Sequence, residues 1–249
     1  KATPPTLESK EPVPANPDII REALQRDEYD DIPVIDIDKE GLPSRGLSYP
    51  DGYSISYRPY VFGEIKRVSG SQTGFLDLAK IVLRGLNTSF DVGDLTYYDF
   101  LNIALKRKLS TLGDSKVVVS MRCPHKDCGA ENSYEIDVAP NKCDIEFWDL
   151  DYTDLPISVD MKLSGDVEFK TYEFSPLTIR GYLELERDGK SKDDIARLAK
   201  QCVNVPFEEA YHKFSRAQYD DMQLLDLIED KLFHGIKPIE AVCANCGRK

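Results

Sequence analysis

Four of the six cysteines form two close pairs that lie far apart in the sequence. Cys123 and Cys128 enclose four residues, Cys243 and Cys246 enclose two, and a glycine follows the second cysteine of each pair. Both spacings are typical of the tight turns, here called knuckles, that present two thiolates to one structural metal ion. Because tetrahedral zinc takes four ligands, the pairs together predict a single four-cysteine zinc site that joins distant parts of the chain.

Other interpretations of the cysteines stay open from the sequence alone. All can be free thiols in ordinary turns, or His125 inside the first knuckle can serve as a ligand. Cys243 and Cys246 can form a redox dithiol, although such a dithiol usually begins a helix within a βαβ unit. Cys143 and Cys202 are isolated. A secreted disulfide framework is small and cysteine-dense, and this chain is neither, so we expect synthesis in a reducing cytoplasm.

The charge balance argues against several classes of partner. The 249 residues carry a net charge of -12, whereas a protein that binds phosphates needs a basic face. Nucleic acid and anionic membrane surfaces are therefore unexpected partners. No apolar run approaches the roughly 20 residues that span a bilayer. A hydrophobic content of 41% is enough for one large domain or two small ones.

The first 41 residues predict an extended acidic arm. Residues 1–40 hold 11 acidic and 5 basic groups, so they carry half of the net charge, and five prolines lie within residues 1–17. Such a composition buries too little apolar surface to fold alone. We expect either a solvated linker or an arm that folds along a neighbouring subunit, with Ile32, Val34 and Ile37 docking on that partner.

Residues 42–140 predict a first α+β lobe. Alternation over 53–57 indicates a strand, and apolar residues at helical spacing predict helices near 75–86 and over 97–112. Alternating residues over 117–121 and 134–138 then predict two strands that place Cys123 and Cys128 at the tip of a hairpin.

Residues 155–249, after a connector at 141–154, follow the same order of strand, helices and cysteine knuckle. Matching dipeptides support the parallel: Tyr98-Asp99 with Tyr219-Asp220, and Cys128-Gly129 with Cys246-Gly247. We therefore predict an α+β fold of two similar strand-helix-strand lobes that arose by internal duplication and are joined by the four-cysteine zinc site.

Sequence motifs of enzymes are missing from the chain. It has three histidines, no nucleophile elbow, no phosphate-binding P-loop and no dinucleotide glycine fingerprint. Paired acids such as Glu208-Glu209 are common in a chain with 44 acidic residues and indicate solvated faces. A site of four cysteines also leaves no open position on the metal. We expect a protein that is not an enzyme and has no small-molecule substrate.

Several short motifs carry a family resemblance. The segment Leu42–Pro50, the pair Arg58–Pro59 with Glu64, and the late C-x2-C-G at Cys243–Gly247 follow one another in order. Together they resemble the baseplate hub and hub-assembly proteins of T4-like phages, the myoviruses. The resemblance covers residues 42–249. The first knuckle departs from it, because four residues rather than two separate its cysteines.

The resemblance implies a structural component of the baseplate hub in a contractile phage tail, which binds other hub, tube or wedge subunits. Such a chain is made and assembled in the cytoplasm of the bacterial host and ends in the virion. A hub assembly chaperone that is absent from the mature virion is the main alternative. A tail-associated hydrolase is a third hypothesis, for which the sequence offers no cluster of catalytic residues.

Overall fold

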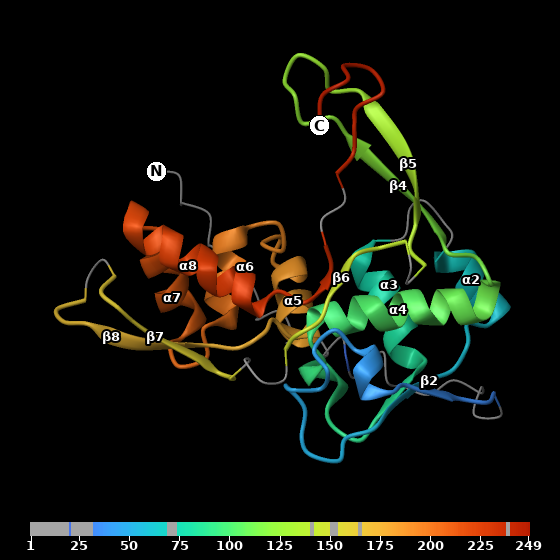
Figure 1. Ribbon diagram of the computed structural model, residues 1–249, viewed down its shortest axis with the longest axis horizontal. Coiled ribbons are helices and arrows are strands. Elements are labelled where there is room, and N and C mark those ends of the chain that lie inside the picture. Colours follow the sequence, from blue (N-terminus) through green and yellow to red (C-terminus); the bar gives the residue numbers. More distant parts are fainter. Residues whose placement is uncertain are drawn as a thin grey trace, which may run out of the picture.

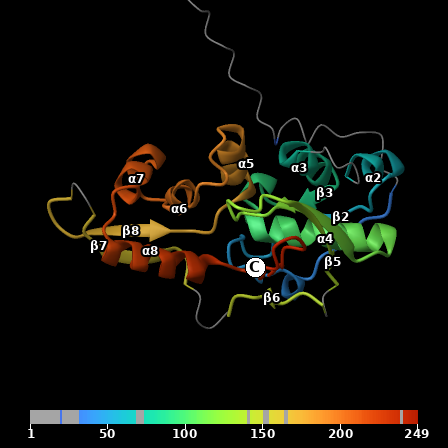
Figure 2. The same ribbon diagram turned by 90° about the horizontal axis from the view of Figure 1, so that it is seen from above.

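The computed structural model describes residues 20, 32–68, 74–139, 142–149, 154–163, 166–237 and 240–249. Within these residues the fold is a mixed α/β arrangement of seven α-helices and small antiparallel sheets. Two lobes lie side by side, and a hairpin projects from the first of them (Figures 1 and 2). Among the helices described, none is long and apolar enough to cross a membrane.

The first lobe packs three helices against a small sheet. The sheet is antiparallel and consists of β1 (Ile35–Asp36), β2 (Ile55–Tyr57) and β3 (Leu86–Thr88), in that order. The helices are α2 (Phe62–Val68), α3 (Phe75–Arg84) and α4 (Tyr97–Leu112). Two short 3-10 turns, η1 (Lys39–Gly41) and η2 (Val92–Asp94), complete the lobe. The predicted helix over 97–112 is confirmed. It begins where the Thr96 hydroxyl accepts from the Asp99 N–H, and it ends at Gly113, whose φ of 63° suits glycine.

The end of the predicted N-terminal arm belongs to this lobe. Ile35 pairs with Tyr57 across the sheet, and the Ile37 N–H donates to the Ile55 carbonyl at 2.9 Å. Ile20 is buried in the same apolar core, and Ile37 packs against it. Ile37 thus contacts the core of its own chain, whereas Val34 is 50% exposed, and docking of the arm on a neighbouring subunit stays a prediction. Residues 1–19 and 21–31 of the arm lie outside the described residues.

The predicted cysteine hairpin is confirmed. Strands β4 (Lys116–Arg122) and β5 (Glu131–Asp137) pair antiparallel, with Arg122 opposite Glu131 next to the first knuckle. The hairpin stands clear of both lobes (Figure 1). All residues of β4 except Val117 are exposed. A two-stranded hairpin without a packed face is marginally stable in water, so this hairpin needs support at its tip.

The second lobe places three helices beside a two-stranded sheet. Its elements are β7 (Ile157–Met161), β8 (Lys170–Phe174), α6 (Asp194–Gln201), α7 (Phe207–Phe214) and α8 (Tyr219–Leu232). The helix α5 (Ile179–Arg187) lies at the junction, because its Ile179 and Leu183 are buried in the core of the first lobe. Tyr172 and Phe174 of β8 are fully buried in its core. The predicted connector is not a bare linker, because its β6 (Ile145–Glu146) pairs with β9 (Gly235–Ile236) directly after α8.

One short backbone arrangement occurs in both halves of the chain. In the first, a strand ends at Tyr57, two helices follow, and the chain returns to pair Leu86 with Tyr57. In the second, β8 ends at Phe174, α5 and α6 follow, and Cys202 returns to pair with Phe174. The residue after each strand also donates its N–H to the carbonyl of the residue just before the returning one. These bonds run from Arg58 to Gly85 and from Ser175 to Gln201, both at 2.9 Å.

A buried ion cluster supports the first lobe. Arg58 donates two bonds to the Glu64 carboxylate, at 2.8 and 2.7 Å, and Arg107 donates a third at 2.9 Å. Arg107 is fully buried and also donates to the carbonyls of Arg58 and Ile81. Although burial alone would raise it, these arginines hold the pKa of Glu64 below its usual value. One side chain of α4 thereby fixes the start of α2 and the end of α3.

A second buried carboxylate fixes the segment Leu42–Pro50. Asp99 of α4 accepts from the Ser44 N–H at 3.0 Å, from the Ser44 hydroxyl, and from the Tyr49 hydroxyl at 2.5 Å. Ser44, Tyr49 and Asp99 are all buried, so each donor satisfies an oxygen that water cannot reach. The serine and tyrosine of this motif are therefore structural.

His234 lies at the junction between the lobes. Its Nδ1 donates to the Leu232 carbonyl at 2.9 Å, which leaves Nε2 to accept from the Thr96 hydroxyl at 2.9 Å. The ring packs on Trp148 with centroids 4.1 Å apart and is fully buried. Burial lowers the pKa of His234 below its ordinary value, so the folded chain holds it neutral.

Acid should therefore destabilise the fold through His234. In the unfolded chain His234 becomes protonated near pH 6.5, whereas in the folded chain it does so only at lower pH. The free energy of unfolding therefore falls as the pH drops from the unfolded-state pKa toward the folded-state pKa, by up to about 1.4 kcal/mol per pH unit. Denaturant titrations at several pH values check this. His234→Gln should show a weaker loss than the wild type, and exposed His212→Gln should match the wild type. Parallel curves for all three proteins would contradict the prediction.

Candidate metal centre

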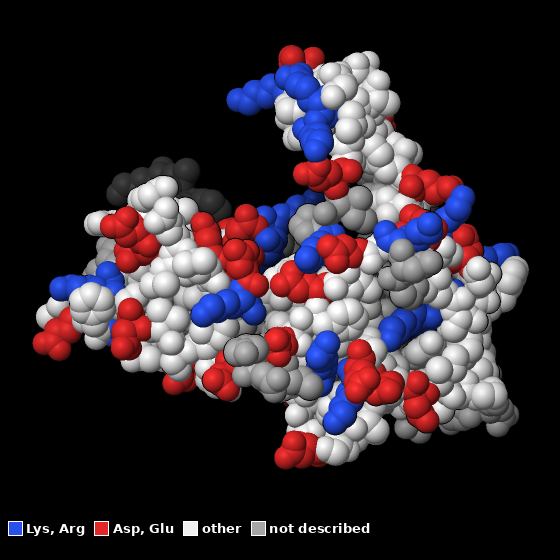
Figure 3. All heavy atoms as spheres, viewed as in Figure 1, with Lys and Arg blue, Asp and Glu red and all other residues white. Residues whose placement is uncertain are grey.

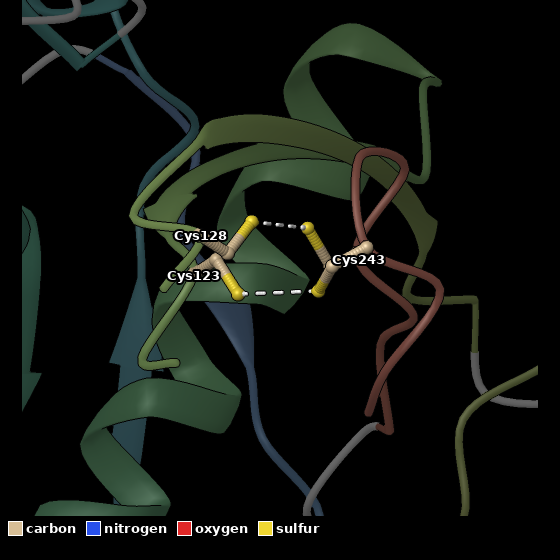
Figure 4. A group of neighbouring side chains, drawn as sticks. Cys123, Cys128 and Cys243 are labelled. Atoms are coloured by element: carbon tan, nitrogen blue, oxygen red, sulfur yellow. Dashed lines mark hydrogen bonds between the residues drawn. The ribbon is translucent and has the colours of Figure 1, made fainter. Parts of the chain in front are cut away.

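The two knuckles bring four sulfur atoms together at the tip of the hairpin. The Sγ atoms of Cys123 and Cys246 are 3.8 Å apart, those of Cys128 and Cys243 are 3.7 Å apart, and all four lie within 4.8 Å of one another. Figure 4 shows the two pairs facing each other, one from the hairpin and one from the C-terminal segment. The predicted ligand set is thus assembled in space, and its residues are suited to hold a metal ion.

The sulfur separations fit a metal rather than a disulfide. Four sulfurs at about 2.3 Å from a central zinc ion lie about 3.8 Å from one another in a regular tetrahedron. A disulfide needs about 2.05 Å, far shorter than either separation. All six cysteines are free thiols in the structure.

The first knuckle extends the ladder of the hairpin. Cys123 donates its N–H to the Ala130 carbonyl at 2.8 Å, which continues the pairing beyond Arg122. The chain then turns, and the N–H groups of Cys128 and Gly129 both donate to the His125 carbonyl, at 2.9 and 3.1 Å. Gly129 has a φ of 57°, which a side chain would disfavour.

The second knuckle closes with the same turn. The Gly247 N–H donates to the Cys243 carbonyl at 2.8 Å, four residues back, as Gly129 does to His125. Gly247 also has a positive φ, 69°. This comparison gives the C-x4-C spacing of the first knuckle a simple explanation. His125 occupies the backbone position that Cys243 has in the second knuckle, and Cys123 lies two residues earlier on the strand.

Two asparagines form a second layer around the sulfurs. The Asn132 amide of β5 donates to the Cys243 sulfur, and its oxygen accepts from the Ala244 N–H at 3.0 Å. The Asn245 amide donates to the Cys128 sulfur at 3.4 Å. Each asparagine therefore contacts the opposite knuckle and orients a ligand, as outer-layer groups of metal sites do. Sequence reasoning missed both residues, although Asn245 lies inside the C-x2-C motif.

Further contacts hold the C-terminal segment on the hairpin. Arg248 pairs with Asp127 at 2.5 Å, and the Tyr134 hydroxyl of β5 donates to the Val242 carbonyl at 3.2 Å. His125 contributes here as well, because its Nε2 lies 3.0 Å from the Lys249 carbonyl. The imidazole of His125 thus contacts the second knuckle at its main chain and is outside the group of four clustered ligand atoms.

The thiols differ in acidity. Backbone N–H bonding, first of all from Cys246, lowers the pKa of Cys243 to about 6, and the pKa of Cys246 is lowered by the backbone N–H of Arg248. At Cys123 the His125 backbone N–H acts in the same direction, but burial and the three neighbouring sulfurs raise its pKa to about 12. The backbone N–H groups of the second knuckle therefore favour the thiolate, which is the form that binds metal ions.

The remaining candidates do not join this centre. Cys143 and Cys202 lie elsewhere, and Cys202 is buried in the core of the second lobe. A separate cavity of about 530 Å³ lies beside the segment Leu42–Pro50 and is lined by charges of both signs, including Lys39 and Asp51. The lining residues of that cavity include no cysteine or histidine.

Comparison with known proteins finds no matching family model, no matching curated protein and no matching solved structure.

Loss of one ligand from the second knuckle should loosen the hairpin. Cys243→Ser leaves three sulfurs, so a metal ion binds more weakly and β4 and β5 lose the support at their tip. We expect amide exchange across 117–138 to become at least about tenfold faster. Cys143→Ser is the matched control. The Cys143 thiol donates to the Asp137 carbonyl at 3.2 Å, and a serine hydroxyl can keep that bond, so exchange across 117–136 should stay as in the wild type. Unchanged protection in Cys243→Ser, with disruption confined to residues after 240, would contradict a shared site.

Proposed function

We propose that this chain is a structural, non-enzymatic subunit of the baseplate hub in a contractile phage tail, with one zinc ion bound by Cys123, Cys128, Cys243 and Cys246. The sulfur cluster is the observation that carries the non-catalytic role. Four thiolates fill a tetrahedral ion, whereas a catalytic zinc keeps a position for water or substrate. The baseplate assignment rests on the resemblance carried by Leu42–Pro50, Arg58 and Glu64.

The donor set favours zinc as the metal. Thiolates are soft ligands that select zinc, copper(I) or iron–sulfur clusters over magnesium and calcium. The separations of 3.7 and 3.8 Å match the edges of a zinc–sulfur tetrahedron. Such an ion also compensates the charge of four thiolates gathered within 4.8 Å.

An internal duplication accounts for the two knuckles. The strand, the helix pair and the returning residue repeat with the same hydrogen bond, as Arg58 to Gly85 and Ser175 to Gln201. The knuckles also repeat a glycine-closed turn, as described above for Gly129 and Gly247. In this proposal each ancestral lobe carried half of the ligand set, and the metal binds only where both halves meet.

Protein subunits are the proposed partners. The net charge of -12 disfavours binding to phosphates, and acidic and basic side chains are interspersed over the face drawn in Figure 3. Exposed apolar side chains on the hairpin and on α8, among them Met121, Tyr219 and Leu227, suit protein contacts better than a highly charged ligand. The proposed location is the virion, after assembly in the host cytoplasm.

Mass spectrometry of purified virions and of hub assembly intermediates tests this function. A structural subunit should be present in both. Presence only in intermediates would favour the assembly chaperone, and absence from both would overturn the proposal. Elemental analysis of the reduced chain, prepared without chelator, should find about one zinc per chain. A chain without bound metal would reject the zinc site and leave the virion result to stand separately.

A further inference from the structure

We propose that two copies of this chain associate through the outer edge of β4, with their hairpins paired antiparallel about Ser120 to form one continuous four-stranded sheet. This inference goes beyond the proposed function and does not depend on the identity of the metal. It rests on the hydrogen-bonding pattern of the hairpin, the exposure of β4 and the charges on its two edges.

The pattern of the ladder shows which groups of β4 face outward. Cys123 bonds to Ala130 at one end of the ladder, and Val138 bonds to Ser115 at the other. In an antiparallel pair, bonded and non-bonded positions alternate along each strand. Odd-numbered residues of β4 therefore bond to β5, and even-numbered residues direct their N–H and C=O groups to the outer edge.

Three of these outward residues are free for pairing. Lys116 is already engaged, since its N–H donates to Asp114 at 2.9 Å and its carbonyl accepts from Lys108. Among the described residues, no backbone partner faces the outward groups of Val118, Ser120 and Arg122. Unpaired edge groups of this kind are a template for another strand.

These three residues are complementary to themselves. An antiparallel pairing centred on Ser120 places Ser120 opposite its own copy, and Val118 opposite Arg122 of the second chain. Each such pair exchanges two N–H···O bonds, so every free group of the edge gains a partner while Lys116 keeps its present ones. On the opposite face, the same register brings Val119 against Met121, which are 37% and 50% exposed.

Charge supports a second copy as the occupant of this edge. Val118 is 66% exposed and lies beside Glu135 on β5. Glu135 already pairs with Lys116 at 2.5 Å, and Arg122 donates its Nε to the Gly129 carbonyl at 2.9 Å. In the proposed register the aliphatic stem of Arg122 from the second chain covers Val118, and its remaining N–H groups add to the positive charge around Glu135. The edge of β5 is different, because its outward residues include Glu131, Glu135 and Asp137, and these like charges oppose pairing with a second β5.

The position of the hairpin leaves room for such a dimer. It projects away from both lobes, so the middle of β4 lies away from the helices (Figures 1 and 3). The pairing is isologous, since the same strand of each copy contacts the other, and it closes as a two-fold dimer. The two-stranded hairpin thereby gains the additional strands that it lacks alone.

The hairpin contains a matched pair of test positions. Ser120 and Ser133 are direct cross-strand partners whose hydroxyls lie 3.0 Å apart, and their N–H groups point to opposite outer edges. Proline removes an outward N–H without removing a ladder bond, so both substitutions are tolerated at these edge positions. Only Ser120→Pro should affect the proposed contact.

Sedimentation equilibrium of the metal-loaded chain is the primary measurement. We expect the apparent mass to rise from 28.2 kDa toward twice that value with concentration. Ser120→Pro should weaken the dimer by about tenfold or more, and Ser133→Pro should dimerise as the wild type does. A wild-type chain that stays monomeric at all concentrations, or equal weakening by both prolines, would overturn the proposal.

Amide exchange on the unmodified chain gives a readout that needs no variant. Protection of the Val118, Ser120 and Arg122 amides should increase with protein concentration, whereas that of Ser133 and Glu135 should not change. Concentration-independent exchange at all five amides, or increased protection on β5 instead, would place any self-association elsewhere and reject this edge.

Discussion

The approach of the four cysteine sulfurs is the contact on which the projecting part of the molecule depends. Cys123 and Cys246 are separated by 123 residues, and their meeting closes a loop that includes the whole second lobe. Residues 240–249 contain no helix or strand, and most residues of β4 are exposed. Each would be marginal alone. Thiolates shared between them, with Asn132 and Asn245 donating across the centre, make one unit of the two segments.

A different constraint holds the first lobe, namely two carboxylates, of which Glu64 is partly buried and Asp99 is fully buried. Glu64 accepts from two arginines, and Asp99 accepts from Ser44 and Tyr49. Loss of one partner from such a buried group costs about 3–5 kcal/mol when it leaves a charge uncompensated. The residues that carry the family resemblance are largely these same ones. The side chains of these motifs therefore fix the backbone of the first lobe.

Local sequence patterns correctly predicted the elements that have strong apolar periodicity or clear start and stop residues. The helix over 97–112 has an apolar stripe, a threonine cap and a glycine stop, and the hairpin has alternating strands around a knuckle. The cysteine spacing also identified the four clustered ligands. Arg107 could not be found in this way, because a lone arginine on a helix is expected to be exposed until its partners, 25 to 49 residues away, are placed. Pairing of β1 with β2 and of β6 with β9 was missed for a related reason. Strands of two or three residues show no measurable alternation, and only their distant partners define them.

The position of the sulfur centre limits the mechanical role that a bound metal ion could have. The lobes already contact each other away from the hairpin, where Tyr97 donates its N–H to Leu177, Ile179 donates to Leu95, and Thr96 bonds to His234. The sequence alone suggested that a metal joins the lobes. These contacts show that the lobes meet without a metal at the tip. A metal ion bound there would instead fix the direction of the hairpin. The base of the hairpin continues from α4, and its tip lies against the segment that follows α8. A hairpin restrained at both ends presents the β4 edge in one orientation, which lowers the entropy cost of pairing it with another strand.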